Sequence, residues 1–118
     1  MIMGGTDYKG RPLDLVQEVA YASGSVVSKT LMNKPVGSLT LFAFDAGQGL
    51  SEHTSPYDAA VQILDGEAVI NIGGSPLTAR SGQMVIMPAD VPHSLWAEKR
   101  FKMLLIMIRQ PSAASDEG

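Results

Sequence analysis

The feature that most constrains the fold is the regular return of turn residues along the chain. From residue 25 to residue 109, short apolar or alternating segments are separated by glycine, proline, asparagine and aspartate. Intervals of about 8–12 residues without a long helical period are typical of an antiparallel sandwich or barrel. We therefore predict an all-β domain. The predicted strands are 25–32, 38–46, 59–66, 67–74, 76–79, 83–88, 93–97 and 101–109.

Two pairs of residues are the clearest turn signals, and one segment is ambiguous. Asp65-Gly66 and Gly73-Gly74 both follow apolar segments, and such pairs favour tight hairpin turns. Residues 13–21, LDLVQEVAY, fit a short helix that begins near Asp14 about as well as they fit a strand. We interpret this segment as a strand or turn that packs on a barrel edge or on a partner subunit.

The length and the two ends of the chain indicate a single domain. With 118 residues the chain has the usual size of one domain. Residues 1–11 are rich in glycine, and we expect them to be flexible. Residues 110–118 are small, polar and acidic, which predicts a disordered tail. The domain is expected to span residues 12–109.

Charge and composition exclude several classes of function. The chain has 9 Lys and Arg against 12 Asp and Glu, a net charge of −3, and no basic block. This argues against a nucleic-acid partner, which requires clustered cations. The chain has no cysteine, so disulfides and thiolate sites are excluded. We found no secretion signal and no stretch long enough for a membrane span, and we expect a cytoplasmic protein.

The two histidines of the chain fall in motifs that resemble those of the cupin superfamily. The first cupin motif is G-x5-H-x-H-x3,4-E-x6-G. If Gly66 is its last glycine, His53 takes the first histidine position. Ser55 then stands at the second histidine position, and Ala59 at the glutamate position.

The second cupin motif, G-x5-P-x-G-x2-H-x3-N, matches GQMVIMPADVPH at Gly82, Pro88 and His93. Asp90 stands where the motif has glycine, and Ala97 where it has asparagine. Both motifs occur in the family's order, and the resemblance extends over roughly residues 24–108. It implies a small jelly-roll β-barrel.

The resemblance also implies a metal site, but an incomplete one. In metal-binding cupins, three histidines and a glutamate point into the barrel and hold an ion. This chain keeps two of these four positions, His53 and His93. We therefore expect a divalent transition metal (Mn, Fe, Ni or Zn) that binds weakly or to part of the molecules. The alternative is a pocket without metal, with both histidines as hydrogen-bonded interior residues.

Strand alternation predicts which residues share the interior with the histidines. Since neighbouring side chains on a strand face opposite ways, one row contains His53, Ser55, Ala59, Val61 and Ile63. The pocket residues that we predict are Ser55, Ala59, Val61, Met87 and Met103. Asp58 is the candidate replacement carboxylate, but it would face inward only through a bulge near Pro56-Tyr57. Otherwise the third ligand would be water, Glu52 or an atom of the substrate.

Further residues leave two interpretations open. Met84, Met87, Met103 and Met107 either line a pocket for an apolar ligand or fill the core, which we favour. Trp96 either anchors a dimer interface or covers a barrel end.

We expect a small stand-alone cupin that binds a small molecule in its barrel. The alternative is a metal-free, non-catalytic barrel that binds or senses a ligand. If the protein is an enzyme, the resemblance favours metal-assisted chemistry of the oxygenase or isomerase type. We also expect a homodimer, formed through the N-terminal strands within residues 13–32.

Overall fold

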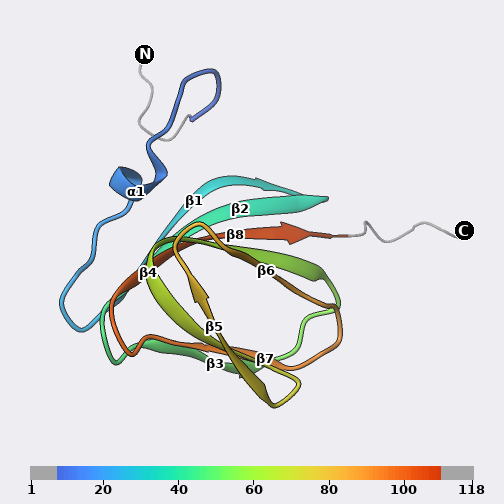
Figure 1. Ribbon diagram of the computed structural model, residues 1–118. Helices are drawn as coiled ribbons and strands as arrows, with labels where there is room; N and C mark the ends of the chain where they lie inside the picture. Colours follow the sequence, from blue (N-terminus) through green and yellow to red (C-terminus); the bar gives the residue numbers. More distant parts are fainter. Residues whose placement is uncertain (1–7, 110–118) are drawn as a thin grey trace, which may run out of the picture.

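The computed structural model describes residues 8–109, and the regular structure in this part of the chain is almost entirely β-strand (Figure 1). One short helix, α1, precedes the strands. The elements are α1 (Leu15–Glu18), β1 (Val26–Lys34), β2 (Gly37–Phe44), β3 (Gly49–His53), β4 (Asp58–Ile72), β5 (Ser75–Arg80), β6 (Met84–Met87), β7 (His93–Trp96) and β8 (Phe101–Ile108). The predicted all-β class is confirmed.

The strands form two antiparallel sheets that share β4. The first sheet has the order β1-β2-β8-β4-β6, and the second has the order β3-β7-β4-β5. Figure 1 shows the two sheets curling toward each other, with β1, β2 and β8 in one wall and β3 and β7 in the other. This arrangement encloses an interior between the walls.

Alternation along β4 fills this interior. Ala59, Val61 and Ile63 are buried in its first half, and Ala68 and Ile70 in its second. They pack with Phe44 and Phe101, whose rings are stacked with centroids 4.4 Å apart. In each half of β4 the buried residues recur at every second position, and the phase changes between the halves, where the register is irregular. The core between the sheets depends on these two apolar faces.

The prediction of a turn at Asp65-Gly66 is wrong. The chain runs through these residues as one strand, with a register irregularity between Ile63 and Asp65 opposite β8. Gly66 has φ +74°, and a Cβ there would collide with the carbonyl oxygen of Arg100. The glycine therefore permits a bulge that bends β4 from one sheet into the other, not a hairpin.

The second turn signal is confirmed. Gly73 and Gly74 connect β4 to β5, and the flanking residues Ile72 and Ser75 are paired. Both glycines have positive φ, 58° and 84°. A two-residue hairpin loop with this backbone is the type that glycine pairs favour.

The interpretation of residues 13–21 as a strand or turn is wrong for their central part. Leu15–Glu18 form one helical turn, closed by hydrogen bonds from the amides of Gln17 and Glu18 to the Asp14 carbonyl. The segment lies on the outer face of the first sheet, where Leu15, Val19 and Tyr21 pack with a second apolar cluster. That cluster contains Leu39, Leu41, Ala43, Leu104 and Ile106. A single turn suffices because this packing, and not helix propensity, stabilises it.

Polar contacts fasten this N-terminal segment to the sheet. The Tyr21 hydroxyl donates to Asp65 at 2.6 Å, and burial together with this bond raises the pKa of the phenol. Lys102 lies 5.0 Å from the Tyr21 ring centroid and donates to the Val16 carbonyl, so its ammonium faces the outer cluster and not the interior. Arg100, 5.1 Å from the same ring, donates to Asp45.

The predictions for the two ends fall largely outside the described residues. Residues 1–7 and 110–118 lie outside them, and residues 8–11 form no helix or strand. No helix within residues 8–109 is long and apolar enough to cross a membrane.

Replacing Gly66 by alanine tests the bulge. The Gly66→Ala variant combines a positive φ with a collision against backbone, whereas Gly47→Ala has φ +84° and open space around the new Cβ. We expect Gly47→Ala to lose about 1–2 kcal/mol, the general cost of the left-handed conformation, and Gly66→Ala to lose clearly more. Urea unfolding measures both. Equal losses would show that the contact with Arg100 does not constrain this position.

Acid unfolding tests the attachment of the N-terminal segment. The bond from Arg100, followed by that from the Gly24 amide, lowers the pKa of Asp45. A lowered folded-state pKa gives stability above the ordinary Asp value of about 3.9 and loses it as pH falls further. We expect Asp45→Asn to flatten the fall of unfolding free energy below about pH 4. Glu98→Gln, at an exposed position, is the control; an unchanged slope in Asp45→Asn would contradict the assignment.

Candidate functional site

The two histidines meet on neighbouring strands of the second sheet. His53 at the end of β3 is paired with His93 at the start of β7. Their Nε2 atoms are 3.1 Å apart, and the rings are 4.3 Å apart between centroids at an interplanar angle of 71°. The structure thus brings together the residues that the two motifs singled out.

A local irregularity in β3 turns His53 inward. Leu50 pairs with Leu95 and His53 pairs with His93, but the register shifts between the two pairs. On a regular strand, residues three apart face opposite sides of the sheet. The irregularity places the Leu50 and His53 side chains on the same side, where both line one cavity.

Hydrogen bonds fix the orientation of both rings. His53 Nδ1 lies 2.9 Å from the Ser51 carbonyl oxygen, and His93 Nδ1 lies 3.2 Å from that of Val91. Since a carbonyl oxygen only accepts, each Nδ1 carries the proton, and in the neutral ring each Nε2 is then an acceptor. Two lone pairs therefore point at each other across 3.1 Å. This arrangement requires an additional proton or a metal ion between the rings.

The histidine pair borders a small apolar cavity of about 90 Å³ between the two sheets. His93 is 5% exposed, whereas His53 is exposed and lies nearer the solvent. The cavity is lined by Leu50, His53, Ser55, Ala59, Met87, His93, Leu95, Met103, Leu105 and Met107. Apart from the imidazoles and one hydroxyl, this lining consists of aliphatic and thioether groups.

Four of the five pocket residues that we predicted line this cavity, namely Ser55, Ala59, Met87 and Met103. Val61 does not: it is completely buried in the core behind the cavity. The predicted set omits Leu50, Leu95, Leu105 and also Met107, for which the sequence left a pocket and a core position open. Leu95 and Leu105 follow His93 and Met103 by two residues on their strands, and strand alternation could have identified them. Leu50 could not have been found, because its orientation depends on the irregularity in β3.

The candidate carboxylates lie elsewhere. The Asp58 Oδ1 accepts a hydrogen bond from the Ala89 amide at 2.8 Å, and Asp58 lines a different groove with Tyr57, Asp90 and Arg109. Within residues 8–109 no cluster of three or more His, Asp or Glu could hold a metal ion. The Asp58 side chain therefore does not face the cavity, as it would have done through a bulge near Pro56-Tyr57.

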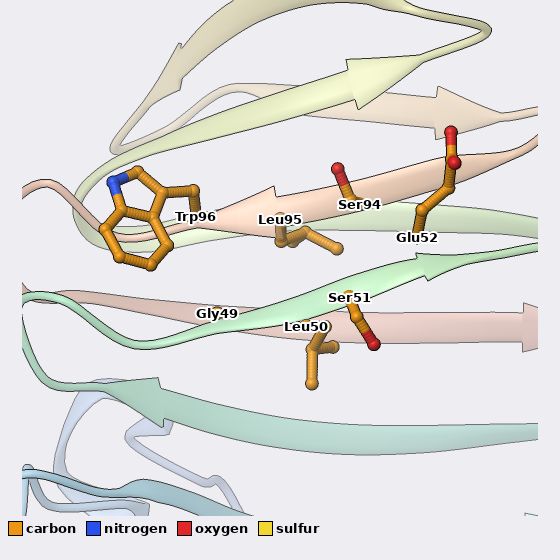
Figure 2. Close-up of a pocket in the computed structure, with 7 residues that line it drawn as sticks. All are labelled: Gly49, Leu50, Ser51, Glu52, Ser94, Leu95 and Trp96. Atoms are coloured by element: carbon orange, nitrogen blue, oxygen red, sulfur yellow. The ribbon is translucent and has the colours of Figure 1, made fainter.

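Glu52 lies in a groove of about 390 Å³ formed by β3 and β7. Figure 2 shows the Trp96 indole at one end of this groove and Glu52 at the other, with Ser51 and Ser94 between them. Strand alternation places Ser94 and Trp96 on the face opposite His93 and Leu95. The groove is thus on the outside of the second sheet, and Trp96 is 44% exposed there.

Two residues at substituted motif positions, Asp90 and Ser55, make hydrogen bonds that support the fold. Asp90, which replaces a motif glycine, has φ +65°, a conformation that aspartate tolerates better than most residues. Its amide donates to the Ser55 carbonyl at 2.7 Å. Ser55 Oγ in turn accepts from the Tyr57 amide at 3.1 Å, which leaves the hydroxyl proton available to the cavity.

A comparison with family models decides the classification: the model described as "Cupin domain" matches residues 40–109. The chain belongs to the cupin family. A solved structure of a conserved protein of unknown function from Streptococcus pyogenes is 36% identical, with a TM-score of 0.84, and the match covers 93% of this cupin and 96% of that chain. The predicted resemblance and jelly-roll architecture are confirmed.

Other solved cupins agree with this classification. A cupin 2 conserved barrel domain protein from Leptotrichia buccalis is 39% identical (TM-score 0.80), over 82% of this cupin and 47% of that chain. A cupin superfamily protein from Desulfitobacterium hafniense is 28% identical (TM-score 0.82), over 89% and 96% of the two chains. No curated protein matches the chain.

The histidine pair of this cupin fits two neighbouring ligand positions of a metal ion. For metal–nitrogen bonds of about 2.05 Å, two Nε2 atoms 3.1 Å apart subtend roughly 98° at the ion. This angle suits adjacent corners of a tetrahedral or octahedral site. The remaining corners have no carboxylate from residues 8–109. The donor set is therefore compatible with a metal, but it is neutral and incomplete.

Proposed function

We propose that this cupin binds a small molecule in the cavity between its sheets, in contact with His53 and His93. The observation that supports the proposal is the convergence of two imidazole nitrogens on one side of an otherwise apolar cavity. Binding sites commonly combine an apolar lining with a few polar groups that orient the ligand. Here the polar groups are the two imidazoles and the Ser55 hydroxyl.

The cavity limits the size and polarity of the ligand. A cavity of about 150 Å³ admits benzene, so about 90 Å³ accommodates a group of only a few non-hydrogen atoms. A larger ligand would place one end inside and extend past His53, which is exposed. We infer an amphipathic ligand whose apolar end contacts the methionines and leucines and whose oxygen atom faces the histidines.

A metal ion in this site would be held by the Nε2 atoms of His53 and His93. With no carboxylate in the cavity lining, we expect Mn, Fe, Ni or Zn to bind weakly or to part of the molecules. Such an ion would supply Lewis-acid polarisation of a ligand oxygen. In the absence of metal, the same nitrogens would accept hydrogen bonds from the ligand, and the protein would be a binding or sensing barrel.

We further propose that the protein is a homodimer that associates near its N-terminal strands. β1 is an edge strand, and an edge strand has unpaired backbone groups. Beside it, an apolar groove of about 250 Å³ includes Met32, Leu39 and Ile106. Val36 and Ile108 at this groove are 55% and 63% exposed. Apolar side chains that gather in this way on a surface favour association.

Removing both imidazoles tests the pocket. We expect untagged wild-type protein to contain more bound metal than the His53→Ala/His93→Ala variant, as measured by elemental analysis. Ser51→Ala, on the same strand but outside the cavity, is the control. A thermal-shift screen with divalent ions and small carboxylates tests the ligand, since a hundredfold excess over Kd stabilises by about 2.7 kcal/mol. Equal metal content in both proteins would exclude the metal, and equal ligand responses would exclude the pocket.

A charge in the apolar groove tests the dimer. We expect light scattering to give twice the 12.5 kDa mass of one chain for the wild type and a single chain for Val36→Asp. Burial of the new carboxylate in an interface would be costly, whereas in the monomer it would stay in water. Thr78→Asp, at an exposed position of β5 in the other sheet, should remain dimeric. A dimeric Val36→Asp would place the interface elsewhere.

A further inference from the structure

Three methionines share the cavity with the histidine pair. Met87 on β6, Met103 on β8 and Met107 on β8 all line it, and the first two are almost completely buried. Strand pairing brings Met87 and Met107 to the two sides of Ala59. The short alanine side chain leaves room between them. Two histidines and three methionines therefore line one small cavity.

The donor atoms in this space differ in kind from those that hard divalent ions require. The cavity lining contains no carboxylate, and its only hydroxyl belongs to Ser55. A dipositive ion held by neutral ligands in an apolar cavity has little to offset its loss of hydration. Thioether sulfur is a soft, neutral ligand that selects Cu(I), and imidazole also binds copper. A monovalent soft ion suits this lining better than Mn, Fe or Ni.

We propose that the ion selected by this cavity is Cu(I), held by the Nε2 atoms of His53 and His93 and by thioether sulfur from the methionine-lined wall. This inference rests on the metal site of the proposed function and names its metal. It also accounts for the convergence of the two Nε2 atoms, which lie 3.1 Å apart while each Nδ1 contacts a backbone carbonyl.

The separation of the two nitrogens explains why sulfur is needed. Two-coordinate Cu(I) is linear, and with bonds of roughly 2 Å its nitrogens would lie about 4 Å apart. The observed 3.1 Å corresponds to a bent pair, which leaves further coordination positions open. On the cavity side, the thioethers and the Ser55 hydroxyl are the remaining donors of the lining. Of these, the soft ion prefers sulfur.

Two other features of the chain are consistent with copper. The sequence contains no cysteine, so no thiolate in the protein competes with the histidine and methionine site. His53 is exposed while His93 is buried, which gives an entry path from solvent past the first imidazole. If the methionines only fill the core, which is the alternative interpretation, their sulfur atoms have no effect on metal affinity.

The test uses the full-length, untagged protein under anaerobic conditions. Cu(I) is titrated against a chromophoric Cu(I) chelator, and Zn(II) and Mn(II) are titrated against their own chelators. We expect one Cu(I) per chain, bound at least a hundredfold more tightly than Mn(II). The Met87→Leu/Met103→Leu/Met107→Leu variant should lose at least tenfold in Cu(I) affinity, since leucine keeps the apolar volume but removes the sulfur. Met84→Leu is the matched control, because Met84 is 49% exposed and does not line the cavity.

X-ray absorption at the copper edge of the wild type gives a second readout that does not depend on the stability of the triple variant. Sulfur neighbours of copper would support the proposal, and a copper shell of nitrogen and oxygen alone would overturn it. Equal Cu(I) affinity in the triple variant and in Met84→Leu would also overturn it. If Cu(I) fails to bind while His53→Ala/His93→Ala still abolishes ligand stabilisation, this inference fails and the proposed binding pocket stands. If the His53→Ala/His93→Ala variant binds the ligand and Cu(I) as tightly as the wild type does, both this inference and the proposed binding pocket fail.

Discussion

The passage of β4 from one sheet into the other is the constraint on which the rest of the structure depends. Its first half pairs with β6 and β8, and its second half with β5 and β7. The bend occurs at Gly66, the residue that tolerates both the positive φ and the close approach of Arg100. Because one strand belongs to both walls, Ala59 and its methionine neighbours face the strand that carries His93. The cavity exists because these two halves of β4 are held at an angle.

The chemistry of the cavity follows from which residues occupy its walls. Position 59 is an alanine, and the space beside it is bordered by methionines and not by acidic groups. The two imidazoles are each tied to a backbone carbonyl through Nδ1, so their free nitrogens converge. A neutral, soft and convergent donor set results. It differs from the three histidines and glutamate that the cupin resemblance implies for metal-binding members, and its ligand preferences should differ accordingly.

Much of the fold could be predicted from the sequence because β-strand alternation and glycine turns are local signals. Gly73-Gly74 produced the expected hairpin, and the interior row of β4 is buried as expected. Asp65-Gly66 carries the same local signal, yet the chain continues as a strand, because its outcome depends on the distant Arg100 backbone. The histidine pair was predicted from the motif resemblance. The inward position of Leu50 and the outward position of Asp58 could not be predicted from the sequence. The first depends on a register shift in β3, and the second on a hydrogen bond to the Ala89 amide.

The central claim is that two imidazole rings, each bonded through Nδ1 to a backbone carbonyl, turn their Nε2 atoms toward each other inside the barrel. Nitrogen-15 NMR of the histidine side chains in metal-free, mildly alkaline solution tests it most directly, because the chemical shift of each ring nitrogen reports whether it carries a proton. We predict that both rings are protonated at Nδ1, and that both Nε2 resonances move together when one equivalent of Cu(I) is added. A ring without a proton on Nδ1, or resonances that respond independently of each other, would contradict the account.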